Sequence, residues 1–143
     1  MSKARSRARR LAMQSLYEWQ IADNTPSDIL STYLNEHDLK STDKAYFETL
    51  LLGVSKHQSE IDTALTPHLA RPLDEVDPIE LAILRLACYE LIHHLDVPYR
   101  VVLNEAIELA KQFGAESGHR FVNGILDRVA TEVRAMEVKL KKS

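Results

Sequence analysis

The stretch VPYRVVLNEAIELAKQFGAESGHRFVNGILDR, residues 97–128, decides the fold of this 143-residue chain. Val97-Pro98 is typical of a helix start, because proline has a preset φ and the first turn does not need its missing donor. Gly114 is expected to end that helix in a left-handed turn, and Ser117 to cap the next one. The apolar face of the first helix comprises Val102, Leu103, Ala106, Ile107, Ala110 and Phe113. This spacing predicts two consecutive amphipathic helices.

The residues before this stretch show the same helical period, interrupted by prolines and glycines. A first helix is predicted over residues 5–22. Thr25 and Pro26 form a cap and a first-turn proline, which predicts a short second helix. Ser41 or Thr42 is expected to cap a third helix. The first half of the chain is therefore expected to be helical.

The middle of the chain suggests how these helices are grouped. One apolar stripe runs through residues 47–65, as in a single helix. The proline-bounded link at residues 68–77 is expected to divide one domain, residues 1–143, into two small packed helical bundles. Their expected limits are about residues 1–70 and 73–136. The sequence predicts an all-α protein with about six to seven helices.

A helix that is apolar almost all round follows this link. Asp77-Pro78 opens it, and its composition is typical of a central helix covered by neighbours. Gly124 lies inside the last predicted helix, where glycine costs roughly 1 kcal/mol relative to alanine. Close approach of another backbone is the expected reason for that glycine.

Composition limits the class of protein. Hydrophobic residues make up 45% of the chain and charged residues 27%, which predicts a folded globule. The single cysteine, Cys88, cannot form an internal disulfide, which suits a reducing compartment. The N-terminus lacks the apolar core of a secretory signal, and no apolar run reaches the length of a membrane span. We therefore expect a cytoplasmic location and no membrane partner.

Charge is distributed unevenly along the chain. The net charge is −3, yet the first ten residues contain no acid. This basic arm contains Lys3, Arg5, Arg7, Arg9 and Arg10. The net charge argues against a basic coat for nucleic acid, whereas the arm indicates one end that attracts anions.

Two interpretations of the arm stay open from the residues alone. Arg10 and Tyr17 share a helix side, and arginines beside a ring are typical of single-stranded RNA binding. A solvated basic helix end, with Tyr17 half-buried, explains the same pattern. A second group, Lys111 with Arg120 and Phe121, straddles the junction of the two helices quoted above. Phe121 is either a stacking ring or a core residue.

Several segments together resemble one known family along nearly the whole chain. They are ARSRARRLAMQSLYEWQ (4–20), YFETLLLGV (46–54), IELAILRLACYEL (79–91), NEAIELAKQFG (104–114) and HRFVNGILD (119–127). In this order they resemble the NusB family of bacterial transcription antitermination factors. The resemblance implies the all-α, two-bundle arrangement and a role supporting transcription of ribosomal RNA operons.

The resemblance also implies partners and sites. Single-stranded boxA-like RNA would be bound by Arg5, Arg7, Arg9, Arg10, Tyr17, Lys111, Arg120 and Phe121. NusE, a basic small-subunit ribosomal protein, would be bound by the helix that carries Glu80 and Arg85. The RNA polymerase antitermination complex would be the larger partner. Members of the family often carry an acid where Ser117 stands. We expect the two surfaces to be separable, so that Glu80→Lys weakens NusE binding alone.

Two alternatives come from other classes of protein. The pairs Glu90 with His93 and Glu116 with His119 have the Glu-x-x-His spacing of di-metal carboxylate enzymes on helical bundles. A helical adaptor that binds only protein is the other alternative. The chain has no HExxH, phosphate-loop or dinucleotide fingerprint, and Cys88 lies in an apolar segment. We therefore expect no catalytic residue, no cofactor and no metal.

Overall fold

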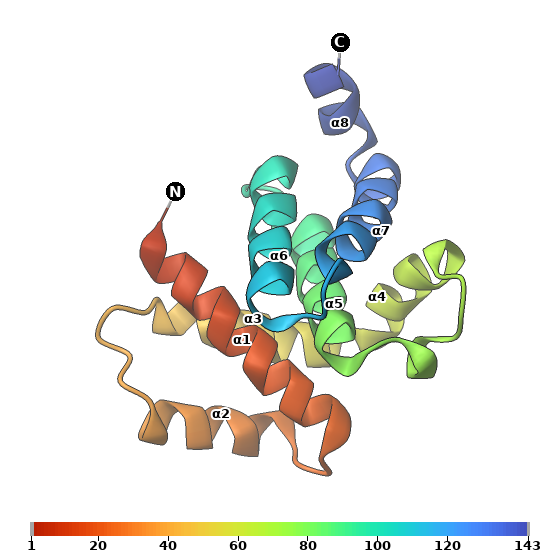
Figure 1. Cartoon of the computed structure of the whole chain (residues 1–143). Helices are drawn as coiled ribbons and strands as arrows, with labels where there is room; N and C mark the ends of the chain where they lie inside the picture. Colours follow the sequence, from red (N-terminus) through yellow and green to blue (C-terminus); the bar gives the residue numbers. More distant parts are fainter. Residues whose placement is uncertain (1, 143) are drawn as a thin grey trace.

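The computed structural model describes residues 2–142, which form helices and no strands (Figure 1). The helices are α1 (Lys3–Ile21), α2 (Pro26–Glu36), α3 (Lys44–Lys56), α4 (Gln58–Leu65), α5 (Pro78–His93), α6 (Tyr99–Phe113), α7 (Gly118–Val133) and α8 (Ala135–Lys142). Two 3₁₀ turns, Thr66–His68 and Leu73–Glu75, link α4 to α5. The all-α prediction is confirmed. Within residues 2–142, no helix combines the length and apolar character needed to cross a membrane.

The described residues contain eight α-helices, slightly more than the six to seven predicted. The single predicted helix through residues 47–65 is two helices, because His57 leaves helical geometry at φ −106° and ψ 23°. Ile61 and Leu65 are nevertheless buried like the apolar residues before the break. Since the apolar stripe continues across the corner, periodicity could not reveal it.

Helix caps confirm some of the predicted boundaries. Thr25 accepts a hydrogen bond from the Asp28 backbone N–H at 3.2 Å, as a cap of α2 should. The expected Ser41 or Thr42 cap of α3 is wrong. Asp43 takes that position, and its Oδ1 accepts from the Tyr46 backbone N–H at 3.0 Å.

The α6–α7 turn also differs from the prediction. Gly114 has φ −84°, so it is not left-handed. Ser117 adopts the left-handed conformation instead, at φ 68°, and makes no side-chain cap to α7. A non-glycine residue in that region costs roughly 1–2 kcal/mol. Neighbouring contacts must therefore hold this turn in place.

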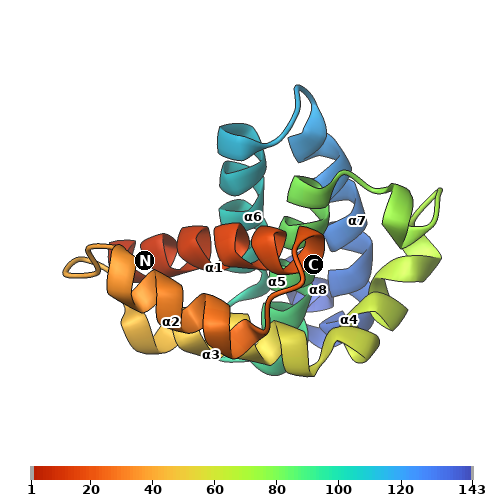
Figure 2. The same ribbon diagram turned by 90° about the horizontal axis from the view of Figure 1, so that it is seen from below.

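Helix α5 is the centre of the molecule. It packs against α1, α3, α4, α6 and α7, and Figure 2 shows it between the α1–α3 group and the α6–α7 pair. All residues from Glu80 to Leu91 are buried, which confirms the prediction of a central helix. Because α5 packs against both groups, they share one continuous core. The division into two bundles near residue 72 stays a prediction.

The carboxyl end of α5 is held by Arg134, a buried arginine at the end of α7. Its Nε donates to the Leu91 carbonyl at 2.7 Å, and its Nη1 to the Val97 carbonyl at 2.9 Å. Its Nη2 donates to the His94 carbonyl at 2.9 Å. The last carbonyls of a helix lack partners within the helix, so this guanidinium supplies hydrogen bonds to carbonyls that would otherwise be buried without a donor.

Two glycines form a matched pair for a stability test. A Cβ at Gly124 would meet only an Arg128 nitrogen at 3.9 Å, so the close backbone approach expected there is absent. Gly124→Ala should therefore raise the free energy of unfolding by about 1 kcal/mol. A Cβ at Gly53 would lie 2.2 Å from the Tyr89 ring, so Gly53→Ala should lower it by about 1–3 kcal/mol. Urea denaturation measures the free energy of unfolding of both variants. Equal changes in Gly124→Ala and Gly53→Ala would contradict this packing.

Candidate RNA interface

One side of α1 carries the residues that a ligand can reach. They recur three or four positions apart, which places them on one helix face. They are Lys3, Arg7, Arg10, Gln14, Tyr17 and Ile21. The face is cationic at its amino end and aromatic or apolar at its carboxyl end.

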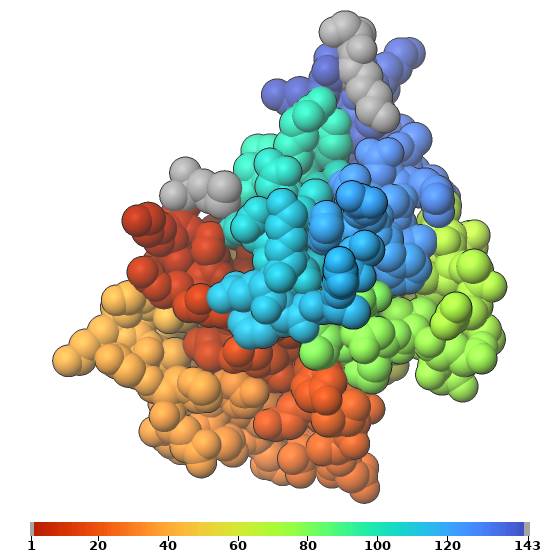
Figure 3. Space-filling model, in the orientation of Figure 1, coloured from red at the N-terminus to blue at the C-terminus, as the bar shows by residue number. Residues whose placement is uncertain are grey.

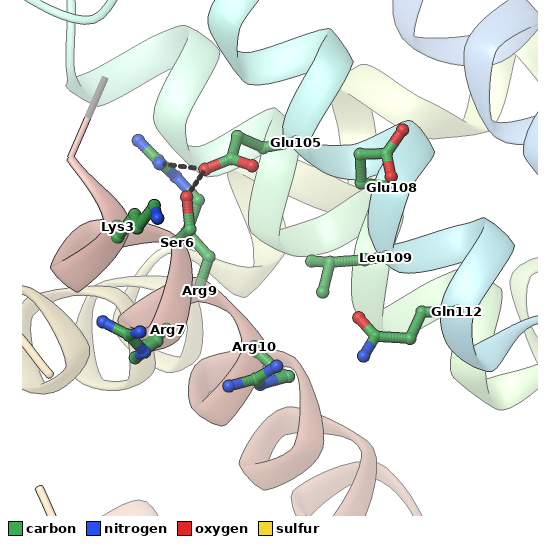
Figure 4. A pocket seen from close by; sticks show the side chains of 9 residues that line it. All are labelled: Lys3, Ser6, Arg7, Arg9, Arg10, Glu105, Glu108, Leu109 and Gln112. Atoms are coloured by element: carbon green, nitrogen blue, oxygen red, sulfur yellow. Dashed lines mark hydrogen bonds and ion pairs between the residues drawn. The ribbon is translucent and has the colours of Figure 1, made fainter. Parts of the chain in front are cut away.

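A groove of about 320 Å³ lies between the amino end of α1 and helix α6, which pack against each other (Figures 3 and 4). It is lined by Lys3, Ser6, Arg7, Arg9, Arg10, Glu105, Glu108, Leu109 and Gln112. A second hollow of about 350 Å³ lies between α1 and the α2–α3 link, and it also includes Arg7 and Arg10. These two side chains therefore line both depressions.

The cationic side chains of the arm differ in how many contacts they make within the protein. Lys3 and Arg10 form no hydrogen bond or ion pair with any residue in the described part of the chain. Arg7 donates one bond, from Nη1 to the Ser41 carbonyl at 3.2 Å. The Arg5 guanidinium stacks 4.1 Å above the Tyr46 ring centroid. Lys3, Arg7 and Arg10 thus keep donors for an anion.

Arg9 does not face a ligand, and the structure corrects that expectation. The residue is 2% exposed. Its Nε donates to Glu90 Oε1 at 2.9 Å, its Nη2 to Glu90 Oε2 at 2.9 Å, and its Nη1 to Glu105 Oε1 at 2.8 Å. The Tyr46 hydroxyl donates to the same Glu90 carboxylate, and Figure 4 shows Ser6 and Arg9 joined to Glu105. The guanidinium donors are therefore occupied inside the protein.

The pKa of Arg9 reflects this environment. Burial by itself would lower that pKa, but the hydrogen bond and the charge of Glu90 raise it above its ordinary value. Burial and Glu90 also raise the pKa of the Tyr46 hydroxyl. Both groups therefore keep their protons, and the bonds from α1 and α3 to α5 stay formed across the physiological range.

Arg85 is the second predicted site residue that the structure corrects. It is 7% exposed, so little of its side chain is available to a partner. Its Nε and Nη2 donate to the Asp62 carboxylate at 2.9 and 3.0 Å, and its Nη1 donates to Gln20 at 3.0 Å. Arg85 therefore joins α5 to α4 and α1. An arginine inside an apolar helix was the available signal for such a buried pair.

The aromatic end of the α1 face borders a third hollow, of about 430 Å³. Its lining includes Gln14, which also lines the second hollow, together with the rings of Tyr17 and Phe113. Both rings are half-buried and pack against the core on one side. We call this continuous surface the α1 face, defined by Lys3, Arg7, Arg10, Gln14, Tyr17 and Phe113. The sequence places Phe113 on the apolar face of its helix, and the structure shows that it both packs against the core and lines this hollow.

Phe121 lies elsewhere, beside Glu80. It is 37% exposed, and both residues line a hollow of about 380 Å³ that also includes Glu75, Asp77 and Arg71. The lining therefore holds more carboxylates than cations. Phe121 and Glu80, which were expected on adjacent surfaces that mutation can separate, share this hollow. Among the other predicted contacts, Lys111 and Arg120 are exposed.

Glu80 also holds the α6–α7 turn. It is 9% exposed, and the Ala115 backbone N–H donates to its carboxylate. A Cβ at Gly118 would lie 2.4 Å from its Oε2. Burial and the charge of Asp77 raise the pKa of Glu80, while the Ala115 bond opposes them. Glu80 thus supports the turn from which Arg120 and Phe121 follow.

The groups of the di-metal alternative do not converge within residues 2–142. The Glu90 carboxylate binds Arg9 and Tyr46, whereas His93 Nε2 lies 2.6 Å from Glu60 Oε1. The metal-capable cluster found there contains His93 without Glu90. Burial also raises the pKa of the Cys88 thiol to about 12, which keeps it protonated and unreactive.

The fold and this surface define a helical protein with one cationic and aromatic face. The model of the NusB family matches residues 6–131, and the chain belongs to that family. The transcription antitermination protein NusB of Xanthomonas campestris pv. campestris (strain B100) is 56% identical over 133 residues, which cover 93% of this chain and 84% of that protein. The protein of the same name from Shewanella halifaxensis (strain HAW-EB4) is 55% identical over 130 residues, covering 91% and 96%.

Solved structures agree with this membership. NusB of T. maritima superposes with a TM-score of 0.81 at 35% identity, covering 92% of this chain and 94% of that one. A chain from the crystal structure of antitermination factors NusB and NusE in complex with dsRNA superposes with a TM-score of 0.84 at 28% identity. That match covers 92% of this chain and 99% of the other. The predicted family resemblance is confirmed.

The neighbouring residues Arg9 and Arg10 should respond very differently to substitution. Arg9→Ala should lower the free energy of unfolding by about 3–5 kcal/mol, because Glu90 would stay buried without its partner. Arg10→Ala removes a half-exposed side chain without a protein partner, so its effect should stay within about 0.5 kcal/mol. Urea denaturation of both variants gives the comparison. Similar losses in the two would show that Arg9 is not the buried anchor described above.

Glu80 can be tested through three substitutions. Glu80→Gln should preserve stability at neutral pH, because its amide oxygen still accepts from Ala115 and no buried charge remains. Glu80→Ala removes that acceptor and Glu80→Lys replaces it with a donor, so both should destabilise the α6–α7 turn by about 1–3 kcal/mol. Hydrogen exchange at residues 115–118 measures this directly. If hydrogen exchange is unchanged in Glu80→Lys, Glu80 does not support the turn and only lies at the rim of the hollow that contains Phe121.

Proposed function

We propose that this chain is an RNA-binding transcription antitermination factor that pairs with NusE and binds boxA-like single-stranded RNA. Relatives named as transcription antitermination proteins support the transcriptional role. The structural neighbour that contains NusB, NusE and dsRNA supports NusE and RNA as the partners. Support of ribosomal RNA operon transcription, within an RNA polymerase antitermination complex in the cytoplasm, is part of the same proposal.

The observation that carries the RNA assignment is the α1 face. Its amino end offers Lys3, Arg7 and Arg10, whose donors are largely unused by the protein. Its carboxyl end offers the rings of Tyr17 and Phe113 around one hollow. Phosphates would meet the guanidinium groups while bases stack on the rings, the combination by which single strands are commonly held. Arg5, Lys111 and Arg120 would add cationic contacts around this face.

The hollow shared by Glu80 and Phe121 is the second surface in this proposal. Its excess of carboxylates, from Glu75, Asp77 and Glu80, favours a basic protein segment over an RNA phosphate. We assign the acidic rim to NusE. Phe121 would stack on RNA at the border between the two partners, and Glu80 would position it through the α6–α7 turn.

Recognition alone accounts for this activity. The buried Glu90 carboxylate and the Asp62 carboxylate are engaged in ion pairs, and the buried Cys88 thiol stays protonated. We propose that the chain is not an enzyme and needs no cofactor to bind RNA. Its mechanism would consist of phosphate neutralisation, base stacking and a protein interface.

The salt dependence of RNA binding tests whether the cationic end of the α1 face contacts phosphates while the aromatic end stacks on bases. The double variant Arg7→Ala/Arg10→Ala should weaken binding of a boxA-like RNA. The slope of log K against log salt should fall by about 0.7 for each phosphate that the protein no longer neutralises. Tyr17→Leu should weaken binding by about 1–3 kcal/mol while leaving that slope unchanged, because a stacked ring releases no counterion.

Two controls make this result decisive. Lys139→Ala removes an exposed cation on α8, away from the α1 face, and should change neither affinity nor slope by as much. Circular dichroism confirms that each variant is folded. If the double arginine variant keeps wild-type affinity and slope, the RNA assignment of this face is wrong. The alternative of a helical adaptor that binds only protein would then be favoured.

A further inference from the structure

Two imidazoles and a carboxylate meet on the surface where α3, α4 and α5 come together. His57 occupies the corner between α3 and α4, Glu60 lies in the first turn of α4, and His93 is the last residue of α5. His93 Nε2 lies 2.6 Å from Glu60 Oε1, and His57 Nδ1 lies 3.7 Å from the same oxygen. One ligand atom from each residue lies within 4.8 Å of the others.

These separations are close to those of a metal site. In a tetrahedral zinc site with bonds of about 2.0–2.1 Å, neighbouring ligand atoms lie about 3.3 Å apart. The three side chains are between 29% and 51% exposed, so small rotations can bring them to that spacing. A metal ion would replace the hydrogen bond between His93 and Glu60.

The surroundings limit how the imidazoles can turn. The His57 and His93 rings lie 4.2 Å apart, and the Tyr89 ring stacks on both at 6.1 and 5.1 Å. Tyr89 is itself buried against Gly53, so its ring limits the rotation of the two imidazoles. Imidazole and carboxylate ligands suit zinc and its neighbours, whereas calcium and magnesium prefer oxygen ligands alone.

We propose that His57, Glu60 and His93 bind one Zn²⁺ ion, with water in the fourth position. The sequence predicts no metal, and its Glu-x-x-His spacing pairs His93 with Glu90 on one helix. The present set joins the α3–α4 corner to α4 and α5, which no short sequence pattern reveals. The ion would link the α3–α4 corner to the carboxyl end of α5 and stabilise the folded chain, since unfolding separates its ligands. None of these residues belongs to the α1 face.

The test uses the untagged full chain, freed of metal with a chelator and titrated with Zn²⁺ by calorimetry. We expect saturable binding of one ion per chain and a rise in the melting temperature. His93→Gln, which keeps a hydrogen-bonding group beside Glu60, and His57→Gln should each weaken zinc binding by at least about tenfold. His119→Gln, which removes an imidazole outside the cluster, should bind as the wild type does. Melting curves in chelator show that each variant is folded.

The outcomes are distinct. Loss of the one-to-one site in both cluster variants, with retention in His119→Gln, supports the proposal. No saturable binding by the wild type would overturn it. Equal zinc affinity in the double variant His57→Gln/His93→Gln and in the wild type would assign the ion to another place and overturn it as well. RNA binding by the cluster variants should match the wild type, so a failure here leaves the proposed function untouched.

Discussion

The buried ion pair between Arg9 and Glu90 is the constraint on which the rest of the structure depends. Glu90 lies on α5, the helix that packs against both halves of the chain. Arg9 binds its two oxygens and also Glu105 on α6, while Tyr46 on α3 binds it from another side. Three helices therefore meet at the Glu90 carboxylate, and Arg9 joins α6 to them through Glu105. A buried charge is strongly destabilising without its partner, so the position and the rotation of α1 follow from this pair.

This fixed rotation explains how one basic segment serves two purposes. Since Arg9 points inward, Arg7 and Arg10 lie to either side of it along the helix and reach the surface grooves. Tyr17 then falls seven residues beyond Arg10, two turns away on the same side. In the proposed function Glu80 would combine structure and recognition in a similar way, because it supports the α6–α7 turn and rims the hollow that contains Phe121. Structure and ligand binding are thus coupled through the same helices.

Sequence reasoning predicted the helices and the central place of α5 because apolar periodicity records burial directly. It missed the roles of Arg9 and Arg85, because a charge within a segment does not reveal its distant partner. Arg9 and Glu90 are 81 positions apart, and Arg85 and Asp62 are 23 apart. The corner at His57 was missed since the apolar stripe continues across it. The α1 face was predicted only in part, because Phe113 joins it through tertiary packing.

A structure of the chain bound to a boxA-like single strand tests most directly whether one side of α1 binds RNA while Arg9 stays inside the protein. We expect phosphate oxygens within hydrogen-bonding distance of Arg7 and Arg10, a base stacked on Tyr17, and Arg9 still paired with Glu90. Arg9 released from Glu90 and bound to a phosphate would contradict this expectation. So would RNA bound only at a surface that contains no part of the α1 face.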